Sequence, residues 1–154
     1  MSELKFRFAE IKDTDLYFNW ANDIDVRQNS YNQEAINYEN HVKWFKSKLN
    51  SNNCFFYLFL NNSEDPVGQV RIDKNEEIII GISVDKKFRG KNLSSQMIRM
   101  ASDDFLKNNT GAVINAYIKE NNEASYKSFI NAGFIEKEVV LINNHNSYKL
   151  CKKI

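Results

Sequence analysis

Cysteine, proline and long apolar runs are scarce in this sequence, and each scarcity excludes a class of protein. The 154 residues include two cysteines and one proline. Cys54 and Cys151 lie far apart and have no second pair, which excludes a disulfide framework or a cysteine-based zinc site and is typical of a reducing compartment. Apolar runs stay well short of the roughly 18 residues that a membrane-spanning helix needs, and the sequence shows no N-terminal secretion-signal pattern. We therefore expect a cytoplasmic protein that engages no membrane and binds no metal.

An excess of charge is absent as well. The 21 basic and 20 acidic side chains leave a net charge of +1, so we expect no nucleic-acid partner. The sequence contains neither G-x-x-x-x-G-K-[ST] nor G-x-G-x-x-G, which excludes a P-loop and the common dinucleotide-binding turn. Apolar residues make up 42% of the chain and aromatic residues 13%. This content suffices for one sizeable core, and we expect a single domain over residues 1–154.

Hydrophobic periodicity predicts strands and helices in alternation. Strands are predicted at residues 4–9, 54–60, 67–72, 77–84, 112–118, 134–142 and 147–150. Helices are predicted at residues 14–22, 38–49, 93–106 and 122–131, and residues 25–37 are expected to form a polar loop. The order β-α-α-β-β-β-α-β-α-β-β predicts an α/β fold, with a mixed, mostly antiparallel sheet and helices on both faces.

Residues 84–95 join a predicted strand to the longest predicted helix and are the segment around which the chain is organised. The first N–H groups of a helix have no partners within the helix and lie at the positive end of its dipole. Backbone N–H groups of the turn can form a nest for phosphate oxygens, and Arg89 and Lys91 add positive charge. The turn therefore predicts an anion site, with an ordinary solvent-exposed turn as the alternative.

Two stretches resemble the Gcn5-related N-acetyltransferase (GNAT) family. The turn is similar to the family's pyrophosphate-binding motif, [QR]-x-x-G-x-[GA]: Arg89 fills the first position, Gly90 often follows it, and Asn92 and Ser94 replace the two small residues. The second stretch is similar to the pattern N-x-x-[AS]-x-x-x-[YFL]-x-x-x-G-F. Its matching residues are Asn122, Ser125, Phe129, Gly133 and Phe134. The alternative is structural, with a helix cap at Asn122, a helix stop and core phenylalanines.

The resemblance implies the GNAT fold and an enzyme that moves acetyl from acetyl-CoA to a primary amine by direct attack. It implies that the strand ending at Val84 and the strand ending at Ile118 separate, and that the pantetheine arm enters the gap. Gly81 is expected to mark a bulge that opens this gap. The residues expected to contact the coenzyme are Ile82, Ser83, Val84, Arg89, Gly90, Lys91, Asn92, Leu93, Ser94, Ser95, Asn122, Ser125 and Phe129.

Direct attack requires a neutral amine, so a base is expected at the site. His41, Glu76 and Glu77 are the candidates, although a histidine packed on a helix and two turn carboxylates explain them equally well. Many family members use a tyrosine at the position of Phe129 to protonate the departing thiolate, and this chain has no hydroxyl there. Tyr126 is the candidate that could supply the proton instead.

The first third of the chain carries a W-x-N-D, V-R-x-x-S and H-x-x-W-F series. This series resembles enzymes that acetylate nucleotide-linked amino sugars, of the pseudaminic-acid type, which implies a small-molecule amine acceptor. The residues expected to contact the acceptor are Arg27, Asn29, Tyr31, His41 and Trp44. Two alternatives stay open: a protein N-terminal acetyltransferase of the ribosomal-protein type, and a non-enzymatic regulatory module that binds coenzyme A. Homodimer formation is also left open.

Overall fold

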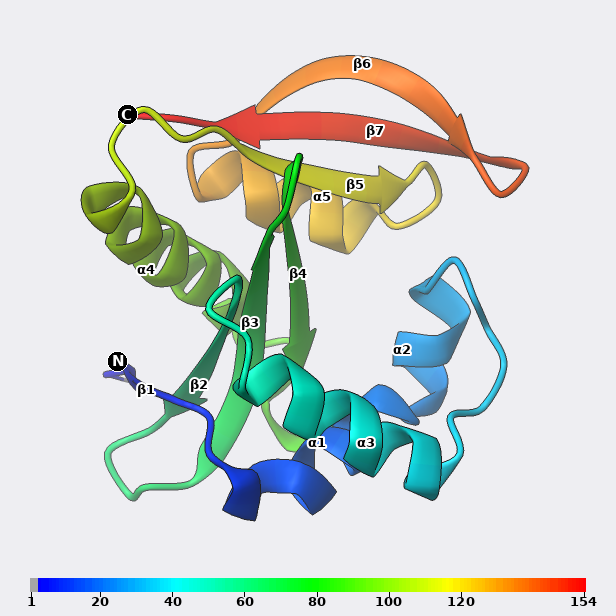
Figure 1. Ribbon diagram of the computed structural model, residues 1–154. Helices are drawn as coiled ribbons and strands as arrows, with labels where there is room; N and C mark the ends of the chain where they lie inside the picture. Colours follow the sequence, from blue (N-terminus) through cyan, green and yellow to red (C-terminus); the bar gives the residue numbers. More distant parts are fainter. Residues whose placement is uncertain (1–2) are drawn as a thin grey trace.

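The computed structural model describes residues 3–154, and within them the chain forms one seven-stranded sheet flanked by helices (Figure 1). The strands are β1 (Lys5–Phe8), β2 (Cys54–Leu60), β3 (Pro66–Lys74), β4 (Ile78–Val84), β5 (Ile114–Lys119), β6 (Ile135–Ile142) and β7 (His145–Lys152). The helices are α1 (Thr14–Ala21), α2 (Ile24–Asn29), α3 (Tyr38–Leu49), α4 (Leu93–Asn108) and α5 (Glu123–Asn131), with 3-10 turns η1 (Ile11–Asp13) and η2 (Lys86–Phe88). The predicted α/β class with a mixed sheet is confirmed.

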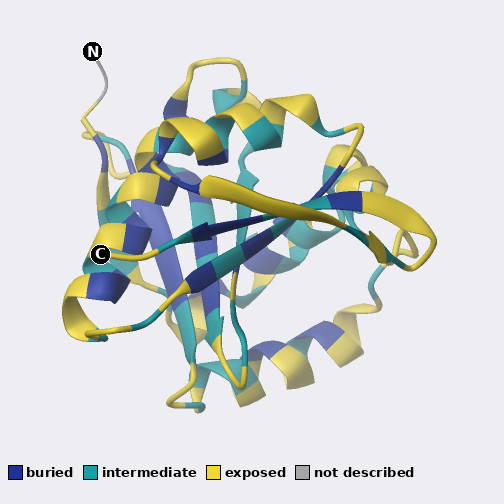
Figure 2. Cartoon of the chain, turned by 90° about the horizontal axis from the view of Figure 1, so that it is seen from above, coloured by how far each residue is buried: buried dark blue, intermediate teal, exposed yellow. Residues whose placement is uncertain are grey.

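The sheet has the strand order β1-β2-β3-β4-β5-β7-β6, and β4 and β5 are the only parallel neighbours among the described strands. The predicted closing hairpin is confirmed by the pairing of β6 with β7. Figure 2 shows that β6, at the edge of the sheet, is largely exposed, whereas buried residues follow the central strands. The helices lie on both faces, as predicted (Figure 1). Within residues 3–154, the structure contains no helix with the length and apolar character that crossing a membrane requires.

Strand β2 explains how the two faces are filled. Its alternate side chains point to opposite faces, as in any strand. Tyr57 and Phe59 pack in the core cluster that contains α4 and α5, and Phe56 and Leu58 pack in the smaller cluster beneath α1 and α3. Because both faces of β2 are covered, its sequence reads as a continuous apolar run rather than an alternating one.

Helix α2 occupies part of the segment predicted to be a loop, so this part of the prediction is wrong. The helix has six residues and one large apolar side chain, Ile24, which is 73% exposed, so it carries no hydrophobic stripe. It begins instead at a polar cap, because the Asp23 carboxylate accepts hydrogen bonds from the N–H groups of Asp25 and Val26. Polar contacts at its ends stabilise this helix, and its sequence lacks the hydrophobic periodicity that would predict it.

Strands β4 and β5 separate shortly after they meet. They pair only at Ile78 with Ile114 and at Ile79 with Asn115, so the splayed strands implied by the family resemblance are present. Figure 1 shows β4 and β5 running apart in different directions. The expected bulge at Gly81 is wrong, because the register between β3 and β4 stays continuous through Gly81. The gap therefore arises from the divergence of two regular strands.

Candidate active site

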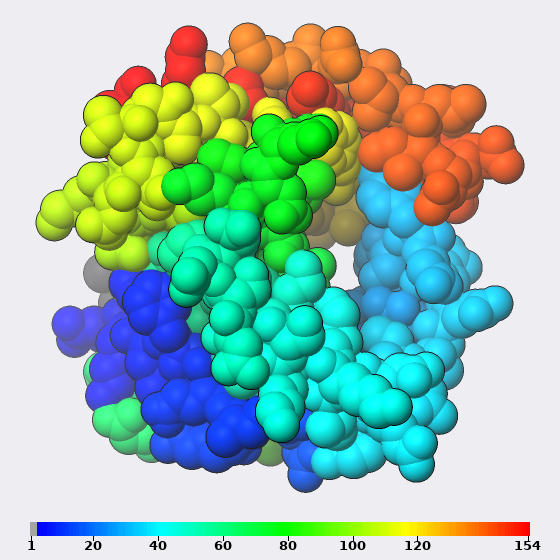
Figure 3. Space-filling view, in the orientation of Figure 1, coloured from blue at the N-terminus to red at the C-terminus, as the bar shows by residue number. Residues whose placement is uncertain are grey.

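A cavity of about 560 Å³ lies where β4 and β5 separate. Its walls come from β4, the turn after β4, the start of α4, the end of β5, the start of α5, and α2. Figure 3 shows the molecule hollowed on this face, between the light-blue segment that contains α2 and the green segment that contains β4. The elements that carry the two sequence signatures thus meet at one site.

The turn between β4 and α4 presents backbone N–H groups to this cavity. Gly90 and Asn92 both have positive φ, at 77° and 57°, and both line the cavity. This left-handed geometry is easy for glycine and tolerated by asparagine, which explains the residue types at the two positions. Asn92 precedes α4 without capping it through its side chain, whereas the Asn122 side chain accepts a hydrogen bond from Ser125 N in α5. The positive end of the 16-residue helix α4 therefore faces the cavity without a side-chain cap from Asn92.

Helix α5 packs beside the start of α4 at the cavity wall. The hydroxyl groups of Ser94 in α4 and Ser128 in α5 lie 2.7 Å apart, so the two helices are joined by a hydrogen bond at the cavity wall. Phe129 also lines the cavity but is almost fully buried, with its ring packed edge-on against Phe134 at 5.1 Å. Phe129 therefore gives the inner end of the cavity an apolar surface and no proton donor.

The edge of β4 offers backbone groups to the gap. Asp85 N–H donates to Val67 O, so the backbone groups of Asp85 point toward β3. These groups alternate in direction along a strand, which places the N–H groups of Ile82 and Val84 on the side of β5. The described pairing with β5 ends at Ile79, so this edge is open where it borders the cavity. An extended ligand can bond there as an added strand does.

Most residues expected to contact the coenzyme line this cavity. They are Ile82, Ser83, Val84, Arg89, Gly90, Asn92, Leu93, Ser94, Asn122, Ser125 and Phe129. Lys91 and Ser95 are not among the lining residues, and the Lys91 ammonium lies over the Phe88 ring at 5.6 Å. Lys91 in the turn and Ser95 in α4 thus lie outside the cavity, a detail that the motif alone does not specify.

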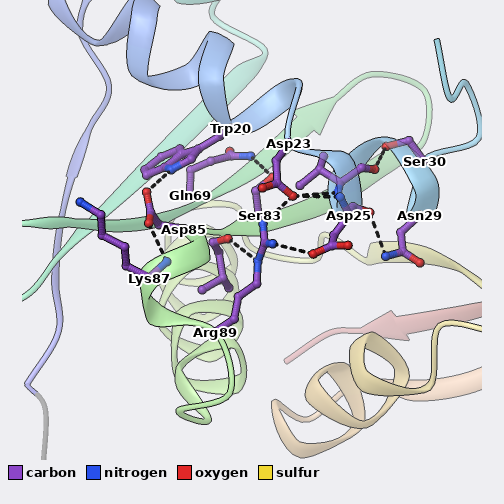
Figure 4. A network of polar contacts seen from close by, with 12 residues as sticks. Trp20, Asp23, Asp25, Asn29, Ser30, Gln69, Ser83, Asp85, Lys87 and Arg89 are labelled. Atoms are coloured by element: carbon purple, nitrogen blue, oxygen red, sulfur yellow. Dashed lines mark hydrogen bonds and ion pairs between the residues drawn. The ribbon is translucent and has the colours of Figure 1, made fainter. Parts of the chain in front are cut away.

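Arg89 does not stand free to meet a phosphate. Its guanidinium donates to Asp23 at 2.9 Å and Asp25 at 3.0 Å, and its Nε donates to the carbonyl of Val84 at 3.0 Å. Figure 4 shows Arg89 reaching from the turn to the start of α2. Burial alone would raise the pKa of Asp23, but the hydrogen bond and the charge of Arg89, together with the hydrogen bonds from the N–H groups of Val26 and Asp25, outweigh burial and hold this pKa below its usual range. Arg89 therefore ties α2 to the turn between β4 and α4.

The structure does not bring His41 or Tyr126 to the cavity. His41 is 2% exposed, lies beneath α1 with its Nε2 at 2.9 Å from the carbonyl oxygen of Thr14, and stacks on Phe45. The Tyr126 hydroxyl donates to Glu136 at 2.6 Å, and the ring packs on Tyr148. Helix packing thus accounts for both side chains, and their geometry does not support the expected roles of base and acid.

Glu77 is linked to the cavity by Tyr117, a residue that sequence reasoning missed. Tyr117 in β5 lines the cavity, and its hydroxyl donates to the Glu77 carboxylate. Burial, followed by the hydrogen bond to Glu77, raises the pKa of Tyr117 well above its usual value, so the phenol is neutral at neutral pH. Glu76, the neighbouring candidate, is exposed. The alternation of the predicted strand 112–118 places Tyr117 on the face opposite Ala116 and Ile118, and this signal could have identified it.

Of the residues expected to bind the acceptor, some line the cavity on the side of α2 and others lie outside it. Asn29 and Tyr31 line the cavity, and the Tyr31 hydroxyl and the Ser147 hydroxyl lie 2.6 Å apart. Arg27 does not: its guanidinium donates to the carbonyl groups of Asn32 and Glu34 and orders the loop after α2. Trp44 also lies outside the lining residues and packs against the Arg71 guanidinium, 5.1 Å from the ring centre.

Two cationic side chains that sequence reasoning missed line the same end of the cavity. Arg71 comes from β3 and pairs with Asp73 through its Nε at 3.0 Å. Lys119 comes from the end of β5 and is 4% exposed. Their placement depends on the approach of β3, β5 and α2, and no local motif encodes that approach.

Neither cysteine belongs to the site. Both lie outside the residues that line the cavity. Burial, with a smaller contribution from Asp73, raises the pKa of the Cys54 thiol to about 12, so Cys54 is a thiol rather than a thiolate at neutral pH. Cys151 is buried in β7. The site therefore lacks an activated cysteine nucleophile within residues 3–154.

Comparison with known proteins identifies a family model that matches the chain and solved structures that share its fold. The model of the acetyltransferase (GNAT) domain matches residues 3–135. A spermidine N-acetyltransferase from Vibrio cholerae, in complex with CoA and spermine, superimposes with a TM-score of 0.87 over 97% of this chain and 94% of its own, at 14% identity. An aminoglycoside acetyltransferase in complex with coenzyme A superimposes with a TM-score of 0.81 over 98% and 95%, at 13% identity. No curated protein sequence matches the chain. At such identities the two structures share the fold with this chain.

Proposed function

Because this chain belongs to the GNAT acetyltransferase family and is an acyl-CoA-dependent N-acetyltransferase, we propose that it acetylates the primary amine of a nucleotide-linked amino sugar. The observation that carries this proposal is the cavity between β4 and β5, a single cavity that extends from the turn before α4 to the residues of α2 and the loop after it. The coenzyme half of this cavity holds most of the residues that the two motifs predict. The half beneath α2 takes the acceptor.

The coenzyme binds along the open edge of β4 in this proposal. Its pyrophosphate lies on the N–H groups around Gly90, Asn92 and the start of α4, and its pantetheine arm bonds to the backbone of Ile82 and Val84. A backbone N–H of β4 then stabilises the oxyanion that forms on the thioester carbonyl. Phe129 closes the inner end of the gap and limits the access of water.

The amine attacks the thioester carbon directly, and the carbon–sulfur bond breaks to release CoA. The ammonium form of an alkyl amine has a pKa of about 10.4, so a proton must leave before attack. We propose that it passes to the Tyr117 hydroxyl oxygen while the Tyr117 proton moves to Glu77. Tyr117 stays neutral throughout, which agrees with its raised pKa. As the carbon–sulfur bond breaks, the nitrogen of the tetrahedral intermediate loses a second proton and the departing CoA sulfur takes it up, so no dedicated acid is needed; thiols have a pKa near 8.5 in water.

Charge at the acceptor end supports a nucleotide-linked acceptor over a polycation. The side chains that line the cavity include three cations, Arg71, Arg89 and Lys119, and a single carboxylate, Asp25, which is already paired with Arg89. Arg71 and Arg89 are paired with carboxylates, so Lys119 is the lining cation without a carboxylate partner within residues 3–154. Its charge disfavours polycations such as spermine and aminoglycosides and attracts a sugar that bears a nucleoside diphosphate, which still presents a free amine.

Coenzyme binding can be tested with a matched pair of variants. Ser94→Asp and Ser95→Asp both add a carboxylate to the first turn of α4, where it suits the helix dipole, but only Ser94 lines the cavity. We expect Ser94→Asp to weaken acetyl-CoA binding about tenfold or more through repulsion of the phosphates, with little change in Ser95→Asp. Equal affinities in calorimetry for both variants and the wild type would overturn the coenzyme position.

The acceptor can be tested by incubating the enzyme and acetyl-CoA with UDP-linked amino sugars, spermidine and peptides with free N-termini, and by measuring thiol release. We expect turnover of the UDP-linked amines in preference to the others. Preferred acetylation of peptides would favour the N-terminal acetyltransferase instead. Binding of acetyl-CoA without thiol release for any amine would favour a regulatory module.

A further inference from the structure

Lys119 is a buried cation at the acceptor end of the cavity, and residues 3–154 supply no carboxylate partner for it. It lines the cavity and is 4% exposed. Within residues 3–154 it forms no ion pair with a carboxylate. Its ammonium donates to the carbonyl of Gln28 at 3.2 Å and lies 5.7 Å from the centre of the Tyr31 ring. An ammonium has three N–H donors, so the contact with Gln28 leaves donors available.

The other cations of the cavity differ from Lys119 in this respect. Arg71 is paired with Asp73 and Arg89 with Asp23 and Asp25. Removing a charge from water without pairing it is unfavourable, and buried charges in proteins are normally paired. A buried lysine that faces a cavity and has no carboxylate partner is therefore suited to an anion that the ligand brings.

The side of the sheet on which Lys119 lies indicates which ligand brings that anion. Ala116 and Ile118 of β5 pack in the core with α4 and α5, the helices that border the coenzyme turn. Alternation along β5 places Tyr117 and Lys119 on the opposite face. There Lys119 contacts α2 and Tyr31, and Tyr117 contacts Glu77. Lys119 thus lies on the same face as the hydroxyl that receives the amine proton.

We propose that Lys119, beside Tyr31, forms an anion subsite that binds a phosphate group of the acceptor. This inference rests on the proposed function and deepens it, because it assigns the recognition of the acceptor's diphosphate to Lys119 in place of Arg27. A lysine ammonium binds phosphate as a point charge, without the paired geometry of arginine. The subsite makes an acceptor that carries phosphate a better substrate than the same amine without it.

The test compares Lys119→Met with Lys43→Met, an equal loss of charge at an exposed site on α3 outside the cavity. For the wild type and for Lys43→Met we expect a much higher kcat/KM for a UDP-linked amino sugar than for the same free amino sugar. In Lys119→Met this preference should fall about tenfold to a hundredfold through KM, with an unchanged Kd for acetyl-CoA. Lys119→Arg, which keeps the charge, should retain most of the preference.

A second measurement separates this proposal from the proposed function. UDP should bind the wild-type complex with CoA, and salt should weaken this binding. In Lys119→Met the affinity for UDP should fall about tenfold or more, and its dependence on salt should flatten. The subsite is overturned if UDP binds the wild type and Lys119→Met equally, or if Lys119→Met weakens acetyl-CoA binding instead. Absence of acetyl transfer to any amine, with normal UDP binding, would overturn the proposed function and leave the subsite standing.

Discussion

At the scale of single residues, the cavity is governed by a few side chains whose partners fix what each can do. Tyr117 donates to Glu77, so its oxygen lone pairs remain available to accept a proton from an amine. Phe129 offers only an apolar ring. Arg89 is held by two carboxylates and acts on the position of α2. The chemistry of the site follows from these partners more than from residue types.

Replacing the Tyr117 hydroxyl should slow acetyl transfer. We expect Tyr117→Phe to lower kcat by about 10²-fold at neutral pH, because the proton path to Glu77 is broken. The loss should shrink as the pH approaches the amine pKa of about 10.4, where neutral amine is plentiful. Rates of thiol release from pH 6 to 10 would check this expectation. Tyr126→Phe, which removes a hydroxyl outside the cavity, is the control. A near-normal kcat for Tyr117→Phe at neutral pH would contradict the relay.

Two glycines near the site should respond differently to an added methyl group. A Cβ on Gly68 would lie 2.4 Å from the carbonyl oxygen of Ser83 and 2.8 Å from Met97, whereas a Cβ on Gly81 would meet nothing within 4 Å. We expect Gly68→Ala to lower the free energy of unfolding by about 1–3 kcal/mol. Gly81→Ala should change it by less than about 1 kcal/mol. Urea unfolding followed by circular dichroism measures both, and equal losses would show that the close approach at Gly68 is not limiting.

At the scale of elements, short segments are held at their ends by polar contacts while the long ones are held by apolar packing. Helix α4 packs in the main core through residues such as Met97 and Phe105. Helix α2 has no buried residues and depends on Asp23 and Arg89. The 3-10 turn η1 is joined to β1 by the ion pair of Arg7 with Asp13 at 2.8 Å. The short elements α2 and η1 are therefore more sensitive to changes of charge than the long ones.

Removing the contacts that hold α2 in place should weaken binding of the acceptor more than binding of the coenzyme. We expect Arg89→Ala and Asp23→Asn each to raise the acceptor KM about three- to tenfold, because either change removes the tie between α2 and the turn. In the double variant, the loss of binding free energy should be smaller than the sum of the two single losses, since both changes remove the same contact. A large loss of acetyl-CoA affinity in Arg89→Ala, without one in Asp23→Asn, would instead show that Arg89 binds pyrophosphate directly.

The contact between Arg7 and Asp13 should make stability depend on pH. Burial opposes the charged form of Asp13, but hydrogen bonds from Arg7 and from the Glu10 N–H prevail and hold its pKa below the usual value of about 3.9. Its stabilising effect is therefore complete above about pH 4 and is lost as the pH falls through the lower folded-state pKa. In urea unfolding, Asp13→Asn should be less stable than the wild type at pH 7, and the difference should narrow toward about pH 2. Glu120→Gln, at an exposed carboxylate, should show a smaller pH-dependent difference.

At the scale of the whole molecule, the sequence predicts the layers and the cavity wall formed by the turn and α5 well, and the cavity wall on the side of α2 poorly. The order of elements along the chain follows from periodicity, and the residues of the turn and of α5 follow from two local motifs. Helix α2 was missed because it has only six residues, and its two apolar residues, Ile24 and Val26, show no helical period. Tyr117 and Lys119 were missed because their roles arise from distant partners, Glu77 and Gln28. His41 was misassigned because a polar residue on a helix can be buried by its neighbours as readily as it can face a ligand.

The brief contact between β4 and β5 also has a thermodynamic consequence. Strands β1–β4 and strands β5–β7 form two blocks of sheet that share only two pairs of residues along their common edge. A pantetheine arm in the gap would bond to that edge and couple the blocks, so the coenzyme would act as a structural component of the sheet. At a concentration of 100 times its Kd it should add about 2.7 kcal/mol to the free energy of unfolding. We expect acetyl-CoA to raise the melting temperature and to slow amide hydrogen exchange at Ile82 and Val84 ahead of β1, and uniform slowing along the chain would argue against this coupling.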